Sequence, residues 1–76
     1  MKITETELLE QLEDIFEKDL EEMKINDSFK DYDEWDSLTQ LSLLAFLNDD
    51  YDIILNNNDL DNLNTISDIF NLINNS

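Results

Sequence analysis

The chain has 76 residues, and a domain of this length buries only about 60% of the surface that its unfolded form exposes, which argues against a deep enclosed active site. It contains no cysteine and no histidine, so disulfides, thiolate metal sites and the commonest general base are excluded. Its 20 acidic residues, 4 lysines and net charge of −16 argue against binding to nucleic acid or to anionic membranes, and they favour partner proteins with basic surfaces.

An amphipathic pattern near the N-terminus predicts one long helix over residues 4–23. Thr4 and Glu7 have the spacing of a capping box, and Ile3 and Leu8 have that of a hydrophobic staple. Apolar side chains then recur on one face, opposite a row of glutamates: Leu8, Leu12, Ile15, Leu20 and Met23.

Residues 24–36 lose the helical spacing, which predicts a long loop. Four spaced apolar side chains are expected to hold this loop against the core: Ile25, Phe29, Tyr32 and Trp35. A connection of this length without secondary structure of its own is uncommon in compact domains and is often functional.

A second helix is expected to begin at Ser37 and to end near residues 48–50. Its apolar residues surround almost the whole helix: Leu38, Leu41, Leu43, Leu44, Ala45, Phe46 and Leu47. Such a helix either packs against several neighbours or shows part of its apolar face to partners.

The C-terminal third predicts two further helices. Residues 57–63 form a short one, and Thr65 opens the last one, with Asp68 near its N-terminus and a frayed end at residues 74–76. The sequence therefore predicts an all-α, small four-helix bundle with three main helices, one short helix and a long first loop, in a single domain over residues 1–76.

The start of the second helix, Asp36-Ser37-Leu38-Thr39-Gln40, admits two interpretations. In the structural one, Ser37 is the N-cap and Gln40 completes a capping box. In the functional one, Ser37 is covalently modified by a phosphate-containing group, which would lie beside unpaired backbone N–H groups at the positive end of the helix. The two are compatible, because the geometry that caps a helix also places a hydroxyl at its N-terminus.

Catalytic and metal-binding interpretations find little support. A serine hydrolase needs a base, normally His or Lys, and no lysine lies near Ser37 in the sequence. An EF-hand needs Gly at its sixth position and Glu at its twelfth, and loops counted from Asp27 or from Asp31 have neither. The acidic residues are therefore interpreted as a solvated surface, with no catalytic residues and no dedicated metal site.

Residues 36–73 resemble the acyl carrier protein family. The shared features are Asp-Ser-Leu opening a helix, an apolar helix body, an acidic end followed by an aromatic residue, a loop, a short helix and a Thr-Ile-x-Asp start to the last helix. The acidic first helix and the long first loop extend the resemblance over nearly the whole chain.

This resemblance implies a carrier protein and not an enzyme. Ser37, with Asp36 and Leu38 completing its motif, would receive 4′-phosphopantetheine from coenzyme A. The implied partners are a phosphopantetheinyl transferase (holo-synthase) and enzymes that load and transfer acyl or aminoacyl groups, held as thioesters on the arm.

The sequence also departs from the family pattern. The family often has Gly two residues before the motif Asp, where this chain has Glu34, and its Trp35-Asp36-Ser37-Leu38 is more similar to D-alanyl, peptidyl or specialised acyl carriers. The family's second helix is usually acidic at the positions of Thr39 and Ser42. The docking residues that the resemblance implies are therefore Leu38 and Leu41, with flanking acidic residues: Asp31, Asp33, Glu34, Asp36, Asp49 and Asp50.

The main alternative is an acidic interaction module that mimics DNA and occupies a basic groove, with Ser37 only a helix cap. No stretch resembles a signal peptide or a membrane span, since the longest apolar run covers only residues 43–47. A cytoplasmic, monomeric protein is therefore expected.

Overall fold

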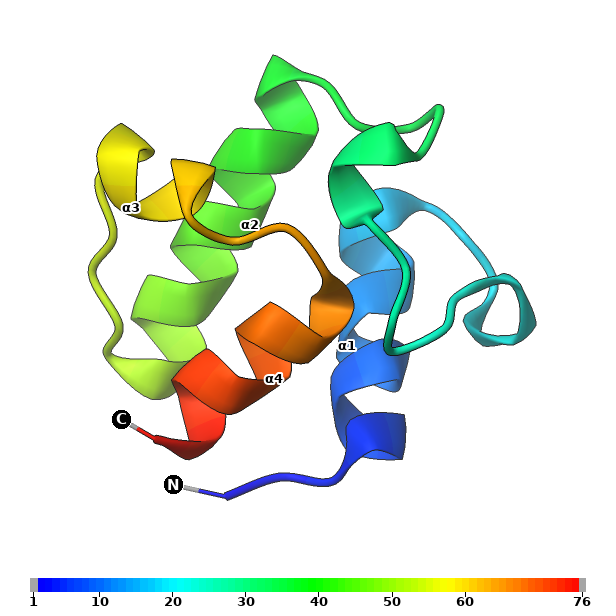
Figure 1. The fold of residues 1–76 in the computed structure, drawn as a ribbon, viewed down its shortest axis with the longest axis horizontal. Helices are drawn as coiled ribbons and strands as arrows, with labels where there is room; N and C mark the ends of the chain where they lie inside the picture. The colour runs from blue at the N-terminus through cyan, green and yellow to red at the C-terminus, as the bar shows by residue number, and fades with distance from the viewer. Residues whose placement is uncertain (1, 76) are drawn as a thin grey trace.

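The computed structural model describes residues 2–75, apart from the side chain of Asn57, and it confirms the all-α bundle (Figure 1). In chain order, the elements are α1 (Glu5–Phe16), the 3₁₀ helices η1 (Leu20–Glu22) and η2 (Phe29–Asp31), α2 (Ser37–Tyr51), α3 (Asn57–Asp61) and α4 (Ile66–Asn74). In Figure 1, α4 lies between the lower parts of α1 and α2, and α3 lies beside α2. Within the described residues, no helix is long and apolar enough to cross a membrane.

The first helix begins as predicted but ends early. Thr4 and Glu7 form the expected capping box, with each side chain accepting from the other residue's backbone N–H at 3.1 Å. The expectation of a helix that extends to residue 23 is wrong, because the chain turns at Glu17, whose φ of 53° and ψ of 45° are left-handed. Lys18 N then donates to Glu13 O at 3.1 Å and closes the helix end.

This turn brings Met23 into the core from a separate segment. Met23 is 3% exposed, although the helical spacing that placed it on the first helix is interrupted at Glu17. A left-handed backbone at a residue with a Cβ atom costs roughly 1–2 kcal/mol. Burial of Phe16 before the turn and of Met23 after it offsets that cost, which explains why packing overrides the amphipathic pattern.

An aromatic cluster holds the first loop against α1, as the spacing predicted. The ring centroid of Phe16 lies 6.0 Å from that of Phe29 and 6.1 Å from that of Trp35. Phe29 and Trp35 meet edge to face at 5.1 Å, and Tyr32 meets Phe16 in the same way at 5.7 Å. Aromatic pairs of this kind contribute about 0.5–1.5 kcal/mol each beyond their buried area.

The same loop also bonds to the C-terminal half of the chain. The sequence indicated a loop without secondary structure, but the 3₁₀ helix η2 lies within it. Lys30 Nζ donates to Leu60 O at 2.8 Å, and Ile66 N donates to Asp27 O at 3.1 Å. The loop therefore connects α1 to the ends of α3 and α4, and it is a structural part of the bundle.

The later helices follow the predicted pattern closely. The second helix begins at Ser37 and ends at Tyr51, one residue beyond the expected end. The short helix α3 stops at Asp61 and is two residues shorter than expected. Thr65 is the N-cap of α4 and forms a capping box with Asp68.

The two ends of the chain are joined by hydrogen bonds. Fraying was expected at residues 74–76, but Asn74 is helical and its side-chain Oδ1 accepts from Ile3 N at 2.8 Å. Asn74 Nδ2 in turn donates to Ile3 O at 3.3 Å. Ser76 lies outside the described residues, so the structure does not test the expectation of fraying at that residue.

The core is apolar throughout, and no polar or charged side chain that the structure describes is buried. Its residues come from every main helix and from the loops: Leu8, Leu12, Phe16, Met23, Phe29, Leu43, Leu47, Ile53, Leu60, Ile66, Ile69 and Ile73. The excess negative charge therefore remains at the surface, where water screens it.

We expect Phe29→Ala to lower the free energy of unfolding by about 3–5 kcal/mol, because it removes a fully buried ring from the aromatic cluster and leaves a cavity. Urea denaturation followed by circular dichroism measures this loss. The control is Ile54→Ala, which truncates a side chain that is 82% exposed and should change stability by less than about 0.5 kcal/mol. Equal effects of the two substitutions would contradict the proposed role of the cluster.

Candidate functional site

Ser37 is the first residue of α2, and its side chain is exposed. The N-cap is the preceding residue, Asp36, whose backbone is extended (φ −150°, ψ −175°) and whose Oδ1 accepts from Thr39 N at 2.8 Å. The expectation that Ser37 is itself the cap, in a box with Gln40, is therefore wrong. The spacing Asp-x-x-Thr contained the correct signal, because Asp caps helices as well as Ser does.

Capping by Asp36 leaves the Ser37 hydroxyl without a capping role. The pKa of Asp36 is lowered from its ordinary value of 3.8, first by the backbone N–H of Thr39 and then by the Thr39 hydroxyl and the Leu38 N–H. The carboxylate is therefore ionised at neutral pH, beside the serine. A phosphodiester on Ser37 would meet this negative charge, so the arm is expected to point away from the protein into solvent.

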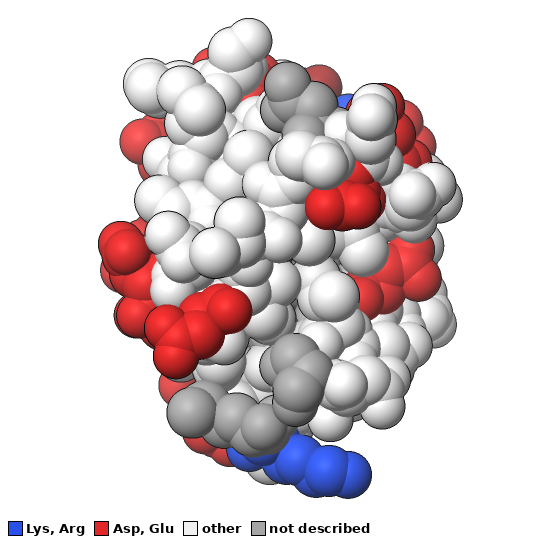
Figure 2. Space-filling model, turned by 90° about the vertical axis from the view of Figure 1, so that its left-hand side faces the viewer, with Lys and Arg blue, Asp and Glu red and all other residues white. Residues whose placement is uncertain are grey.

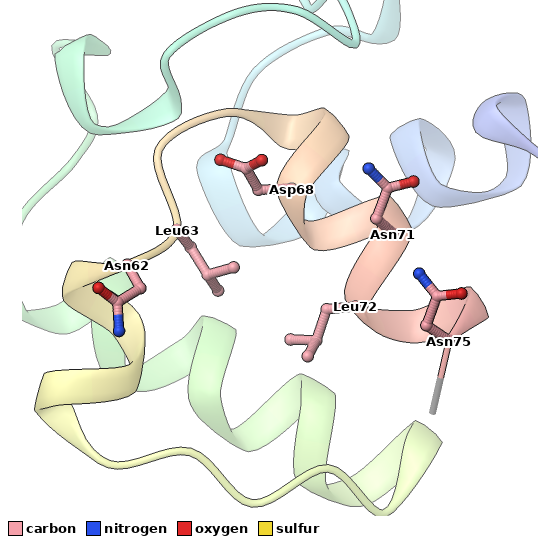
Figure 3. Close-up of a pocket in the computed structure, with 6 residues that line it drawn as sticks. All are labelled: Asn62, Leu63, Asp68, Asn71, Leu72 and Asn75. Carbon is pink, nitrogen blue, oxygen red and sulfur yellow. The ribbon is translucent and has the colours of Figure 1, made fainter.

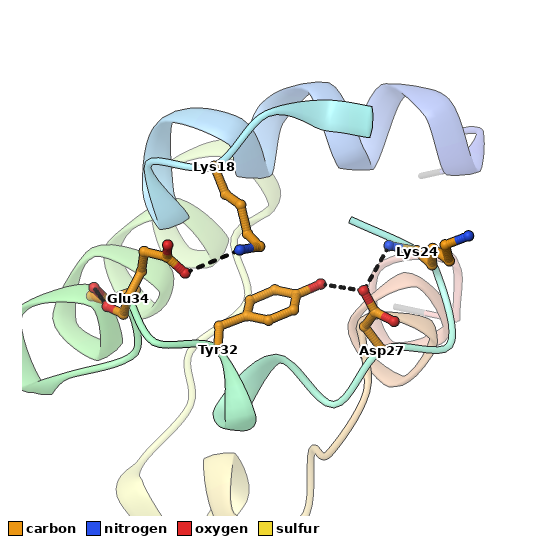
Figure 4. Close-up of polar contacts among 6 residues, drawn as sticks. Lys18, Lys24, Asp27, Tyr32 and Glu34 are labelled. Carbon is orange, nitrogen blue, oxygen red and sulfur yellow. Dashed lines mark hydrogen bonds and ion pairs between the residues drawn. The ribbon is translucent and has the colours of Figure 1, made fainter. Parts of the chain in front are cut away.

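The segment that leads to Ser37 is anchored by side chains on both sides (Figure 4). Glu34 Oε1 pairs with Lys18 Nζ at 3.4 Å, and the same Lys18 nitrogen lies 5.0 Å from the centroid of the Tyr32 ring. Tyr32 OH donates to Asp27 Oδ2 at 2.8 Å, and burial, followed by this hydrogen bond, raises the pKa of Tyr32. Trp35, next along the chain, is held in the aromatic cluster.

Thr39 joins this segment to the helix. Its Oγ1 donates to the backbone O of Glu34 at 2.9 Å, across the two residues that precede Ser37. Sequence reasoning noted only that an acidic residue is usual at this position and did not assign Thr39 a contact. The signal that could have revealed it is a hydroxyl at the third helical position, where a side chain can reach back over the N-cap.

A cleft of about 290 Å³ lies beside Ser37, between the end of α1 and the start of α2. Its lining combines acidic, apolar and hydroxyl side chains: Asp14, Glu17, Glu34, Asp36, Ile15, Phe16, Leu38, Thr39 and Ser42. The sequence did not indicate this cleft, because the residues of α1 and α2 are brought together only by the packing of the two helices.

A second cleft, of about 340 Å³, lies between α3 and α4 (Figure 3). It is lined by side-chain amides and leucines: Asn62, Leu63, Asp68, Asn71, Leu72 and Asn75. The Asp68 carboxylate is already used at the start of α4, where its Oδ2 accepts from the backbone N–H groups of Asn64 and Thr65. None of the lining residues belongs to α2, so this cleft is separate from the Ser37 region.

The predicted docking leucines are both on the surface of α2. Leu38 is 72% exposed and Leu41 is 63% exposed, and both lie close to Ser37 on the first turns of the helix. Exposure of such large apolar side chains has no benefit for folding, since each would be more stable in the core. Part of the apolar circumference of α2 is therefore presented to solvent, as the sequence allowed.

The predicted docking acids fall into two groups. Asp31 and Asp33 are exposed in the loop before α2, and Glu34 beside them is half-buried in its pair with Lys18. Asp49 and Asp50 are exposed at the far end of α2. At 1.5 Å per residue the two groups are about 20 Å apart along the helix, so they lie at its opposite ends and do not form one cluster.

Negative charge is unevenly distributed over the molecule. Fourteen of the 20 acidic residues, and all four lysines, precede Ser37 in the chain. Figure 2 shows the side formed by α3 and the adjacent loop. This side is largely uncharged, and its acidic side chains lie mainly toward its margins. Within residues 2–75, no group of three or more acidic side chains is arranged to hold a metal ion.

These features define a carrier domain, a small helical bundle that exposes one serine at the start of a helix and surrounds it with acidic and apolar surface. A family model described as the phosphopantetheine attachment site matches residues 6–73 of the chain. The chain therefore belongs to this family of carrier proteins, which hold a covalently attached 4′-phosphopantetheine group. No curated protein and no solved structure gives a significant match.

Carrier domains of this family interact with a phosphopantetheinyl transferase and with acyl-handling enzymes, and they are generally not catalytic. The exposed serine fits this role, because a carrier needs a reachable hydroxyl and no base of its own. The proteins that bring the phosphopantetheine group and its cargo must supply the catalytic residues.

The depressed pKa of Asp36 predicts a pH-dependent contribution to stability. A carboxyl whose pKa is lower in the folded state stabilises the fold above its unfolded pKa, and this stabilisation is lost as the pH falls through the folded pKa. We therefore expect Asp36→Ala to destabilise the protein at pH 7, and the difference from the wild type to shrink as the pH falls below 3.8. Urea denaturation at several pH values measures the difference.

Asp36→Asn serves as the matched control, because an amide still caps the helix but does not titrate. A stability difference between wild type and Asp36→Ala that stays constant down to the lowest pH would contradict the assignment of the depressed pKa.

Proposed function

We propose that Ser37 is the attachment point of the 4′-phosphopantetheine group. The observation that supports this most directly is its position, exposed at the first residue of α2, between an N-cap that already satisfies the helix and an exposed leucine. Because Asp36 performs the capping, modification of the Ser37 hydroxyl costs the helix no hydrogen bond at its N-cap.

The modification is a transfer of a phosphoryl group that carries the pantetheine. The Ser37 oxygen attacks the phosphorus of coenzyme A that bears pantetheine, a new P–O bond forms, and the pyrophosphate bond breaks. Adenosine 3′,5′-bisphosphate leaves, and the serine proton passes to a base of the transferase. The attached group supplies a terminal thiol, which this cysteine-free chain lacks, for carrying acyl or aminoacyl groups as thioesters.

The residues of the chain bind partners and present the serine. We define the docking surface as Leu38 and Leu41 with the acidic groups at the two ends of α2: Asp31, Asp33, Glu34, Asp49 and Asp50. The leucines offer apolar area at its centre, and the acids steer the encounter with a partner that has basic side chains at both ends of an apolar groove. One chain presents the whole surface, so the carrier acts as a monomer.

The cargo in this proposal is a specialised acyl group or an aminoacyl group, and not a growing fatty acid of general metabolism. Support comes from the positions where the family is usually acidic, because α2 has Thr39 and Ser42 there. Thr39 is engaged with Glu34 O and cannot serve as a charged docking residue. Partners that read charge in the middle of the helix would find none on this chain.

We expect incubation of the protein with coenzyme A and a promiscuous phosphopantetheinyl transferase to raise its intact mass by one phosphopantetheine group. Ser37→Ala should abolish the gain, because the attacking oxygen is removed. Mass spectrometry of the intact protein, and of its peptides, measures both results. Ser42→Ala is the matched control, since it removes a hydroxyl one turn further along α2 and should still be loaded.

Loading of Ser37→Ala at the wild-type rate would contradict the assignment of the serine. Failure of the wild type with a transferase that is active on another carrier would contradict the function, and it would favour the acidic DNA-mimic module. That module would bind a DNA-binding protein in a salt-sensitive way, with no effect of Ser37→Ala.

The docking surface predicts a separate effect of Leu41→Ala. Removal of a central apolar contact should lower kcat/KM for loading by the transferase roughly tenfold. The folded protein should keep its urea midpoint, because the side chain is 63% exposed. Steady-state kinetics with the apo protein as the varied substrate measures the effect, and an unchanged kcat/KM would exclude Leu41 from the docking surface.

A further inference from the structure

We propose that Thr39 is a positioning residue for the modification of Ser37. Its hydroxyl ties the backbone before the serine to the first turn of α2, and so holds the serine oxygen in the orientation that the transferase requires. This inference rests on the proposed attachment at Ser37. It adds a residue that neither the sequence pattern nor the family match assigns.

Two hydrogen bonds from one residue enclose the serine. Thr39 N donates to Asp36 Oδ1 at 2.8 Å, and Thr39 Oγ1 donates to Glu34 O at 2.9 Å. The two hydrogen bonds therefore close the backbone segment 34–39 on itself, and Ser37 is one of the residues of this segment.

Asp36 is bonded to α2 through its Oδ1 and its backbone oxygen, whereas Glu34 and Trp35 are otherwise anchored to the body of the protein. The Glu34 carboxylate pairs with Lys18 at the end of α1, and Trp35 packs against Phe16 and Phe29. Within the described residues, the Thr39 side chain supplies the bond that fixes the Glu34 carbonyl relative to the new helix. Without that bond only Asp36 ties the segment to the first turn of α2, and the backbone of Glu34 can shift against the helix that carries Ser37.

The chemistry of the contact explains why a hydroxyl stands where the family usually has an acid. A carbonyl oxygen accepts hydrogen bonds, so its partner must donate, and an ionised carboxylate has no proton to give. An acidic side chain at this position would also face the charges of Glu34 and Asp36 across the cleft. At this position the chain therefore has a hydrogen-bond donor that holds the backbone of Glu34, in place of the negative charge that is usual in the family.

Orientation of the attacking oxygen is a large part of the rate in transfer reactions. Small displacements of a reacting group lower the rate strongly, because fewer encounters have aligned orbitals. The expected effect therefore appears in kcat, which reports the oriented complex. KM for the apo protein reports the leucines and carboxylates of the docking surface, and the Thr39 hydroxyl bonds only to the backbone oxygen of Glu34 and not to its carboxylate.

The test compares Thr39→Val with Thr39→Ser in loading by the transferase. Valine keeps the size and branching of threonine but cannot donate, whereas serine keeps the hydroxyl. We expect kcat of Thr39→Val to fall about fivefold to tenfold, the loss that corresponds to one hydrogen bond, with KM for the apo protein within about twofold of wild type. Thr39→Ser should restore most of kcat.

Thr6→Val is the matched control, because it makes the same substitution at an exposed position of α1 far from Ser37 in the sequence. All kinetics are measured at a temperature where each variant is folded by circular dichroism.

Three outcomes would overturn the assignment. Thr39→Val could load with the kcat of wild type, Thr39→Ser could fail to restore it, or the loss could lie entirely in KM. These results differ from a failure of the proposed function, in which wild type itself acquires no phosphopantetheine on Ser37. The latter would remove the basis of both proposals, whereas equal loading of wild type and Thr39→Val removes only this one.

Discussion

The packing of the first loop against the end of α1 is the constraint on which the rest of the structure depends. Phe16 closes α1, and its ring meets Phe29 and Trp35 from a segment that would otherwise be a long unsupported connection. Because Trp35 is fixed there, the chain arrives at Asp36 in an extended conformation and α2 begins at the next residue. The place and direction of Ser37 thus follow from a hydrophobic contact some distance from any chemistry.

The distribution of charge follows from the same core. Because the buried residues are all apolar, every carboxylate among residues 2–75 remains at or near the surface, and only a few are engaged by backbone N–H groups or by lysine. Two of those engaged acids, Asp36 and Glu34, lie just before the serine and stabilise local structure. The exposed acids at the two ends of α2, Asp31, Asp33, Asp49 and Asp50, form no such hydrogen bond or ion pair within the described residues, so their carboxylates are available for partners.

A carrier of this family acts together with an attached phosphopantetheine group and with partner enzymes. The chain has an exposed hydroxyl at the start of α2 and two exposed leucines, and it contains no histidine and no cysteine. A phosphopantetheine carrier needs nothing more, since the thiol comes with the attached group and catalysis comes with the enzymes that bind it. The absence of histidine and cysteine is thus compatible with thioester chemistry.

The sequence by itself determined the class of fold, the start of α2 at Ser37, the capping box at Thr4, the start of the last helix at Thr65, and the aromatic anchors of the first loop. All of these depend on neighbours within a few residues or on a regular spacing of apolar side chains, which a sequence displays directly. Only the tertiary structure decided where α1 ends, since Phe16 and Met23 gain more by packing on separate segments than by sharing a helix. It also decided that Asp36 and not Ser37 caps α2, and that Thr39 reaches back to Glu34 O, because both depend on the direction in which the anchored loop meets the helix.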